Sequence, residues 1–214
     1  MPKRQQEYTV SPKSENQKQY VKALDDRRIR YVAITGPAGG GKSLLAAQRA
    51  GQGLVKGHFH KIVLCRSVTP IKGESLGYLK GDMNQKLEGW LCPITEHLKK
   101  FIPNYSKRVE SGDIEFVSLA QIRGRSFDNC IVIAEECQNM SFDILKCLLT
   151  RMGSKSKLLM NGDIKQSDVR HDDFYAVCEA LTPLHSFKWI ELGKEDIFRS
   201  EDIAEILELL EPLE

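Results

Sequence analysis

No apolar run in this sequence approaches the roughly 18–20 residues of a membrane-spanning helix, and the first ten residues, MPKRQQEYTV, lack the apolar core of a signal peptide. Net charge is also small, because 31 Lys and Arg oppose 29 Asp and Glu to leave +2. This balance argues against a strongly basic coat for DNA, but it allows a local basic groove. These absences favour a cytoplasmic enzyme or binding protein.

The sequence also lacks the spacing of a metal-binding cysteine cluster. No two of its six cysteines form a C-x-x-C pair, and its five histidines show no ligand spacing. Several cysteines lie in apolar runs, such as Cys65 in KIVLC and Cys130 before IVIA. We therefore expect buried, reduced thiols in a reducing compartment.

The length of 214 residues fits one domain, and 41% hydrophobic with 28% charged residues excludes a wholly disordered chain. We expect residues 1–14 to be a flexible lead-in and residues 15–214 to form a single domain. Residues 1–30 carry eight basic and four acidic side chains, whereas residues 191–214 carry nine acidic and two basic ones. This asymmetry allows opposite ends of neighbouring subunits to meet, although two separately solvated surfaces explain it equally well.

Short β-branched runs alternate with longer helical patterns along the chain. Several of the runs have no polar alternation, as parallel strands covered on both faces do. The alternation predicts an α/β three-layer sandwich with a mainly parallel sheet. The predicted strands are Tyr31–Thr35, Lys61–Cys65, Ile114–Val117, Cys130–Ala134, Lys157–Asn161 and Phe187–Glu191. The predicted helices are Glu15–Leu24, Lys42–Gly53, Asn84–Phe101, Ser141–Met152, Asp172–Leu181 and Ser200–Leu210.

A glycine-rich loop between a predicted strand and a predicted helix matches G-x-x-x-x-G-K-[ST] at every fixed position. Glycines let such a backbone curl around a phosphate, and the following helix adds its positive end. Lys42 would reach the β- and γ-phosphates, and the Ser43 hydroxyl would ligate Mg²⁺. A glycine-rich turn without a ligand is the alternative. The predicted nucleotide-binding residues are Gly36, Pro37, Ala38, Gly39, Gly40, Gly41, Lys42 and Ser43.

Two adjacent carboxylates end another apolar strand, in the run IVIAEE. Ligands bind at the carboxyl edge of open α/β sheets, so Glu135 is a candidate metal ligand and Glu136 a candidate to orient or deprotonate the attacking water. The alternative is a pair of acids that cap the next turn. A further strand ends in Gly162-Asp163, and the amide of Gln166 would contact the γ-phosphate or the water.

Several motifs in order resemble the PhoH-like family of P-loop ATPases, and through it the first motor domain of superfamily-one helicases. They are GPAGGGKS, LGYLKGD, IRGRSFDNCIVIAEECQN, LLTRMGSKSKLLMNGDIKQSD and EDIFRS, and the similarity runs from about Gln17 to Arg199. The resemblance implies a RecA-like fold, ATP binding with Mg²⁺, ATP hydrolysis and a role in RNA or DNA metabolism.

The same resemblance assigns roles by position. Gln17 corresponds to the glutamine that reads the adenine edge in such motors, and Lys42 with Ser43 to the phosphate-loop pair. Glu136 corresponds to the catalytic acid, Gln166 to the glutamine of the GD-x-x-Q segment, and Arg199 to a C-terminal arginine finger. The family typically has Asp where this chain has Glu135. One extra methylene displaces the carboxylate, which leaves slow hydrolysis open.

A translocating helicase of one subunit uses two RecA-like domains, whereas this chain has room for one. We therefore expect a homo-oligomer, such as a hexameric ring, with ATP at the subunit boundaries and an arginine supplied by the neighbour. Arg199 and Arg151 are the candidates. The alternative for Arg199 is a surface ion pair with Glu195 or Glu201.

Two basic clusters are candidates for contact with RNA or single-stranded DNA. A solvated basic face is the alternative for each. Three functions stay open: an ATPase coupled to nucleic acid, a small-molecule phosphotransferase, and a non-catalytic nucleotide-dependent switch or assembly factor. The first cluster contains Arg123, Arg125, Lys155 and Lys157, and the second contains Lys99, Lys100, Lys107 and Arg108 with Phe101 and Tyr105.

Overall fold

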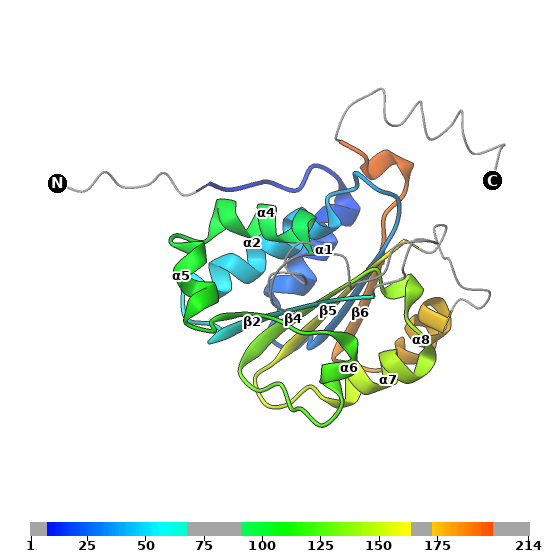
Figure 1. Cartoon of the computed structure of the whole chain (residues 1–214). Helices are drawn as coiled ribbons and strands as arrows, with labels where there is room; N and C mark the ends of the chain where they lie inside the picture. Colours follow the sequence, from blue (N-terminus) through cyan, green and yellow to red (C-terminus); the bar gives the residue numbers. More distant parts are fainter. Residues whose placement is uncertain (1–7, 68–90, 164–172, 199–214) are drawn as a thin grey trace, which may run out of the picture.

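The computed structural model describes residues 8–67, 91–163 and 173–198, and these form three layers (Figure 1). Six strands make one sheet in the order β3-β2-β4-β5-β1-β6, and every pairing is parallel. This confirms the predicted α/β sandwich, and each strand ends within one residue of its predicted range. The strands are β1 Tyr31–Thr35, β2 Lys61–Arg66, β3 Ile114–Phe116, β4 Cys130–Glu135, β5 Lys157–Gly162 and β6 Phe187–Glu191.

Helices cover both faces of the sheet (Figure 1). One face carries α1 (Glu15–Asp25), α2 (Lys42–Val55), α4 (Cys92–Phe101) and α5 (Tyr105–Glu110). The other carries α6 (Leu119–Ile122), α7 (Phe142–Thr150) and α8 (Asp173–Leu181), and short 3₁₀ turns lie at Cys137–Asn139 and Lys194–Asp196. No described helix combines the length and hydropathy needed to cross a membrane. Of the predicted helices, residues 84–90, residue 172 and residues 200–210 lie outside the described ranges.

Alternate residues of each central strand enter two separate cores. On β4, Ile131 and Ile133 pack beneath α1, α2 and α4, whereas Val132 and Ala134 pack against α7 and α8. All four side chains are at most 2% exposed. Because both faces of the strand are buried, its sequence is apolar without alternation. This arrangement places the carboxyl ends of all six parallel strands at one edge of the sheet.

Four of the six cysteines are buried and free, as expected from their apolar surroundings. Cys65, Cys130, Cys137 and Cys178 are buried, whereas Cys147 is half-buried and Cys92 is exposed. Burial raises the pKa of the Cys65 thiol to about 12, so this thiol stays protonated and packs as an apolar group.

The prediction of a nucleic-acid contact is wrong for Lys157. Its side chain is buried, and its ammonium group donates to the carbonyl oxygens of Ala23, Leu24 and Asp26 at 2.6–3.0 Å. Burial lowers the pKa of Lys157 to about 8. The ammonium group thus caps the carboxyl end of α1, where the last carbonyl groups have no hydrogen-bond donor within the helix.

Other members of the two basic clusters form internal contacts. Arg125 makes a two-pronged ion pair with Glu115, with N–O distances of 2.8 and 3.0 Å. Arg108 donates to Asp113 at 2.6 Å. Arg125 also precedes β4 and Lys157 is the first residue of β5, so both lie at the amino edge of the sheet, away from the phosphate loop. The geometry therefore gives these residues a role in holding the fold together.

Candidate nucleotide site

The phosphate loop leaves β1 and curls back into the start of α2. Gly36, Gly39 and Gly41 have φ values of +137°, +88° and +85°, which L side chains rarely adopt. Gly36 also lies so close to Leu192 that an added Cβ would lie 2.7 Å from the Leu192 Cβ. Alternating left-handed residues beside a helix N-terminus form the backbone concavity that binds anions. Glycine is therefore required at these positions.

Lys42 is the first residue of α2 and lines the cavity beside the loop. Its ammonium group donates to the carbonyl oxygens of Gly36 and Pro37, at 2.9 Å for Pro37. Burial lowers the pKa of Lys42, and the negative charges of Asp163 and Glu135 oppose this shift. A buried cation whose hydrogen bonds go to neutral carbonyls gains from an anion bonded to it directly, which is the electrostatic character of a phosphate site.

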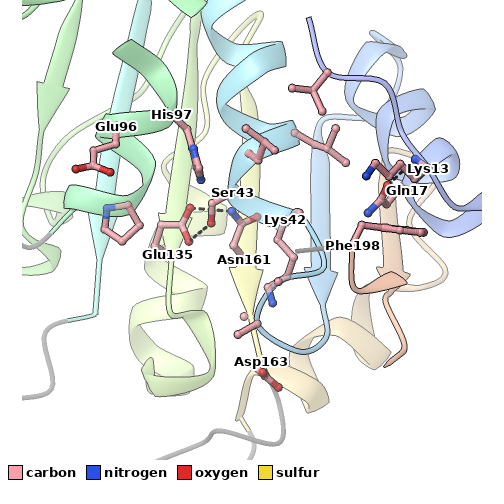
Figure 2. Close-up of a pocket in the computed structure, with 18 of the residues that line it drawn as sticks. Lys13, Gln17, Lys42, Ser43, Glu96, His97, Glu135, Asn161, Asp163 and Phe198 are labelled. Carbon is pink, nitrogen blue, oxygen red and sulfur yellow. Dashed lines mark hydrogen bonds between the residues drawn. The ribbon is translucent and has the colours of Figure 1, made fainter. Parts of the chain in front are cut away.

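Four side chains form a hydrogen-bonded chain between α1 and α2 (Figure 2 shows three of them). Ser43 donates to Glu135 Oε2 at 3.1 Å, and Asn161 Nδ2 donates to Glu135 Oε1 at 2.9 Å. The Tyr20 hydroxyl donates to Asn161 Oδ1 at 3.4 Å, so the amide nitrogen faces Glu135. Both carboxylate oxygens of Glu135, whose side chain is one methylene longer than an aspartate, are thereby held in place. The sequence analysis did not single out Asn161, although it is a polar residue near the end of an apolar strand, directly before Gly162 and Asp163.

The donor set around Glu135 suits Mg²⁺. Hydroxyl and carboxylate oxygens are the ligands this ion prefers, and it is usually held by one or two carboxylates plus phosphates and water. Burial raises the pKa of Glu135, while the bonds from Asn161 and Ser43 lower it. A cation would offset the cost of burying this carboxylate. Within the described residues no cluster of three His, Cys, Asp or Glu offers an alternative metal site.

Glu136 follows β4 with a left-handed backbone, at φ +57°. Its Oε2 accepts a hydrogen bond from Gln138 Nε2 at 2.7 Å, and its Oε1 lies 3.4 Å from a guanidinium nitrogen of Arg66. Gln138 in turn accepts from the Asp163 backbone N–H at 3.1 Å. The turn after β4 is thus tied to the ends of both neighbouring strands.

Gln17 supports the phosphate loop from α1. Its side chain is 5% exposed, and Nε2 donates to the carbonyl oxygens of Gly40 at 3.0 Å and Asp196 at 3.3 Å. Its Oε1 accepts from the Lys13 backbone N–H at 2.7 Å. Main-chain groups therefore occupy both ends of the carboxamide, and the contact between Gln17 and an adenine edge stays a prediction.

A cavity of about 720 Å³ extends on both sides of the loop, within the range of ligand pockets. On one side the Lys13 ammonium lies 5.3 Å from the centre of the half-exposed Phe198 ring. On the other, Glu96 and His97 project from α4 (Figure 2). The sequence analysis singled out none of these four residues. Phe198 lies within the EDIFRS motif, whereas Lys13, Glu96 and His97 lie outside every motif. Residues of the expected lead-in also line the cavity, including Val10.

The structure brings most of the predicted site residues together. Gln166 and Arg199 lie outside the described residues. Arg151 is the C-cap of α7, and its carbonyl accepts from Phe127, just before β4 and far from the loop along the sheet. The predicted residues that line the cavity are Gln17, Ala38, Gly39, Gly41, Lys42, Ser43, Glu135 and Glu136, while Gly36, Pro37 and Gly40 complete the loop.

A parallel sheet with a phosphate loop after β1 and two carboxylates at the end of β4 defines a P-loop nucleotide-binding protein of RecA-like architecture. The match with one family model is consistent with this class. Residues 9–211 match the model of the PhoH-like protein family, and the chain belongs to that family.

Bacterial proteins of the same name are similar to this chain over most of its length. The chain is 35% identical over 205 residues to the PhoH-like protein of Bacillus subtilis (strain 168), covering 94% of this chain and 63% of that protein. It is 31% identical over 198 residues to Protein PhoH of Escherichia coli (strain K12), covering 89% and 55%. The chain therefore spans little more than half the length of these relatives.

A solved structure shows the same fold. The Sulfolobus solfataricus SWI2/SNF2 ATPase core, determined in complex with dsDNA, superposes with a TM-score of 0.50 at 17% identity. The match covers 83% of this chain and 37% of that one. At this identity the likeness concerns the arrangement of the sheet and helices alone.

Proposed function

We propose that this chain is an ATPase that hydrolyses ATP with Mg²⁺ and couples hydrolysis to RNA or single-stranded DNA. One observation carries the first part: a single cavity contains the phosphate loop, Lys42, the Ser43–Glu135 pair and Glu136. These are the parts that phosphoryl transfer to water needs, namely a phosphate cradle, a metal site and a group for the water.

Each residue has a distinct task in this proposal. Lys42 exchanges its carbonyl partners in the loop for the β- and γ-phosphates, gaining charge-assisted bonds. Ser43 and Glu135 hold Mg²⁺, which when bound neutralises negative charge on the phosphates. Glu136 accepts a hydrogen bond from the attacking water and directs it at the γ-phosphate. Asn161 keeps the Glu135 carboxylate facing Ser43.

The proposed coupling to nucleic acid rests on the family to which the chain belongs. The proposed assembly into a homo-oligomer rests on the single sheet that the structure describes. One RecA-like unit supplies one wall of a nucleotide site between motor domains, so a second copy completes it in a homo-oligomer such as a ring. Arg199 or Arg151 of a neighbouring copy then contacts the γ-phosphate. Light scattering of the full chain with ATP measures this assembly directly.

Phosphate release tests the proposed ATPase. With ATP and Mg²⁺ we expect turnover that rises on adding poly-U or single-stranded DNA, and that falls by at least about a hundredfold in Lys42→Ala. Lys56→Ala is the matched control, because Lys56 is an exposed lysine outside the cavity and outside both basic clusters. Tight ATP binding without turnover would instead identify a switch or assembly factor. Phosphate transferred only to a small acceptor would identify a phosphotransferase.

In this proposal Phe198 stacks against the nucleotide base. Phe198 is 42% exposed and lines the cavity, and the Lys13 ammonium group lies close to its ring. Stacking on an aromatic ring is worth about 1–3 kcal/mol per base, so Phe198→Ala should raise KM for ATP roughly tenfold with kcat little changed. Phe198→Trp should keep the wild-type KM. Inorganic triphosphate, which has no base, should inhibit all three proteins equally, and unequal inhibition would contradict the assignment.

A further inference from the structure

Arg66 connects the end of β2 to the proposed catalytic carboxylate. It is the last residue of β2 and pairs in register with Glu135 of β4. Its guanidinium lies 3.4 Å from Glu136 Oε1. The next residue, Ser67, donates from its hydroxyl to the Asn139 carbonyl at 2.9 Å and from its backbone N–H to the Glu135 carbonyl at 3.3 Å. These contacts connect the end of β2 to the turn that carries Glu136.

The side-chain contacts of Glu136 with Gln138 and with Arg66 differ in how easily another group can replace the partner. Gln138 is 1% exposed and is itself held by the Asp163 backbone, so its bond to Glu136 is fixed. The side chains of Arg66 and Glu136 are 30% and 37% exposed. Ion pairs that solvent reaches are weak, and a competing anion can replace one partner. Arg66 thus forms the exchangeable contact.

The two partners also lie differently relative to the nucleotide cavity. Glu136 lines the cavity, whereas Arg66 is not among the residues that line it. The guanidinium therefore reaches Glu136 from outside the space where ATP would lie. Guanidinium groups bind phosphate oxygens through two parallel hydrogen bonds, whereas the contact with Glu136 joins one guanidinium nitrogen to one carboxylate oxygen at 3.4 Å. A phosphate approaching from outside the cavity would compete well for Arg66.

We propose that Arg66 is a positioning residue that holds Glu136 until a phosphate group of a nucleic-acid strand takes its guanidinium, an inference that rests on the proposed ATPase function. Once released, Glu136 Oε1 accepts the hydrogen bond of the attacking water while Gln138 still holds Oε2. Hydrolysis is then slow without a strand and faster with one. The γ-phosphate of ATP is the other source of the same chemistry, and the experiment separates the two.

The experiment compares the full-length wild type with Arg66→Gln, Arg66→Lys and Arg125→Gln. Arg125→Gln is the matched control, since it removes another guanidinium–carboxylate pair at the opposite edge of the sheet. Phosphate release is measured with ATP and Mg²⁺, alone and with poly-U or poly-dT. Strand affinity is measured over a series of salt concentrations, and affinity for a fluorescent ATP analogue is measured for every protein.

In Arg66→Gln we expect strand-independent turnover to rise roughly two- to fivefold, as for loss of one part-exposed ion pair. The ratio of turnover with a strand to turnover without one should fall towards one. Affinity for the ATP analogue should stay unchanged. The slope of log affinity against log salt should drop by about one, because one phosphate contact is lost. Arg66→Lys should retain part of the stimulation, and Arg125→Gln should match the wild type.

The results that would overturn the role of Arg66 differ from those that would overturn the proposed ATPase function. Wild-type turnover with the same stimulation in Arg66→Gln overturns the role of Arg66 and leaves the ATPase proposal standing. Raised turnover with an unchanged salt slope assigns the competing phosphate to ATP and overturns the nucleic-acid source. Turnover that falls in Arg66→Gln, with stimulation retained, also overturns the role. Absence of turnover from every protein in every arm overturns both proposals.

Discussion

Glu136→Gln is expected to lower ATP turnover by at least about a hundredfold, the contribution typical of a positioned acid–base group. The amide keeps the shape and still accepts from Gln138, but it orients the water with a neutral oxygen and takes no proton. The phosphate loop and Lys42 are untouched, so affinity for an ATP analogue should stay within about twofold. Phosphate release and equilibrium binding of the analogue measure the two effects separately.

Lys42→Ala provides the contrast for this prediction. It removes the cation that faces the phosphates, so affinity and turnover should both fall. If Glu136→Gln lost affinity as severely as Lys42→Ala, Glu136 would be a nucleotide-binding residue and its assignment to the water would be wrong. If it kept full turnover, another group would orient the water.

Glu135→Gln is expected to raise the melting temperature of the protein without Mg²⁺ while reducing Mg²⁺-dependent turnover by about a hundredfold or more. Burial raises the pKa of Glu135, which means that the fold disfavours the carboxylate form. A glutamine satisfies the same partners, accepting from Asn161 and donating to Ser43. It removes the buried charge but can no longer attract the cation.

The pH dependence of stability follows from the same shift. The folded chain keeps a proton on Glu135 at a pH where the unfolded chain has lost it. Wild-type stability should therefore fall as the pH rises from the ordinary carboxyl range through the raised pKa, and Glu135→Gln should lack this part of the fall. Thermal unfolding from about pH 5 to 8, with and without Mg²⁺, measures it. A variant less stable than the wild type at pH 7 without Mg²⁺ would contradict the prediction.

The strands and the phosphate loop were predictable because their signals are local. A run such as CIVIA, Cys130–Ala134, has no charged position to place in water, so it specifies a strand buried on both faces. The loop needs a left-handed backbone at Gly39 and Gly41, and glycine is the residue type that indicates such a conformation in a sequence. Lys157 shows the limit of such reasoning, since a lysine beside a strand looks solvent-exposed until the end of α1 is known to lie over it.

The sequence alone determined the class of fold, the phosphate loop and the two acids after β4, because each depends on residues that are neighbours in the chain. Only the tertiary structure decided which partners those residues have. Asn161 lies 26 positions from Glu135, and Arg66 lies 70 positions from Glu136. Their contacts arise from the order and register of parallel strands, which bring distant carboxyl ends to one edge of the sheet and which no local pattern specifies.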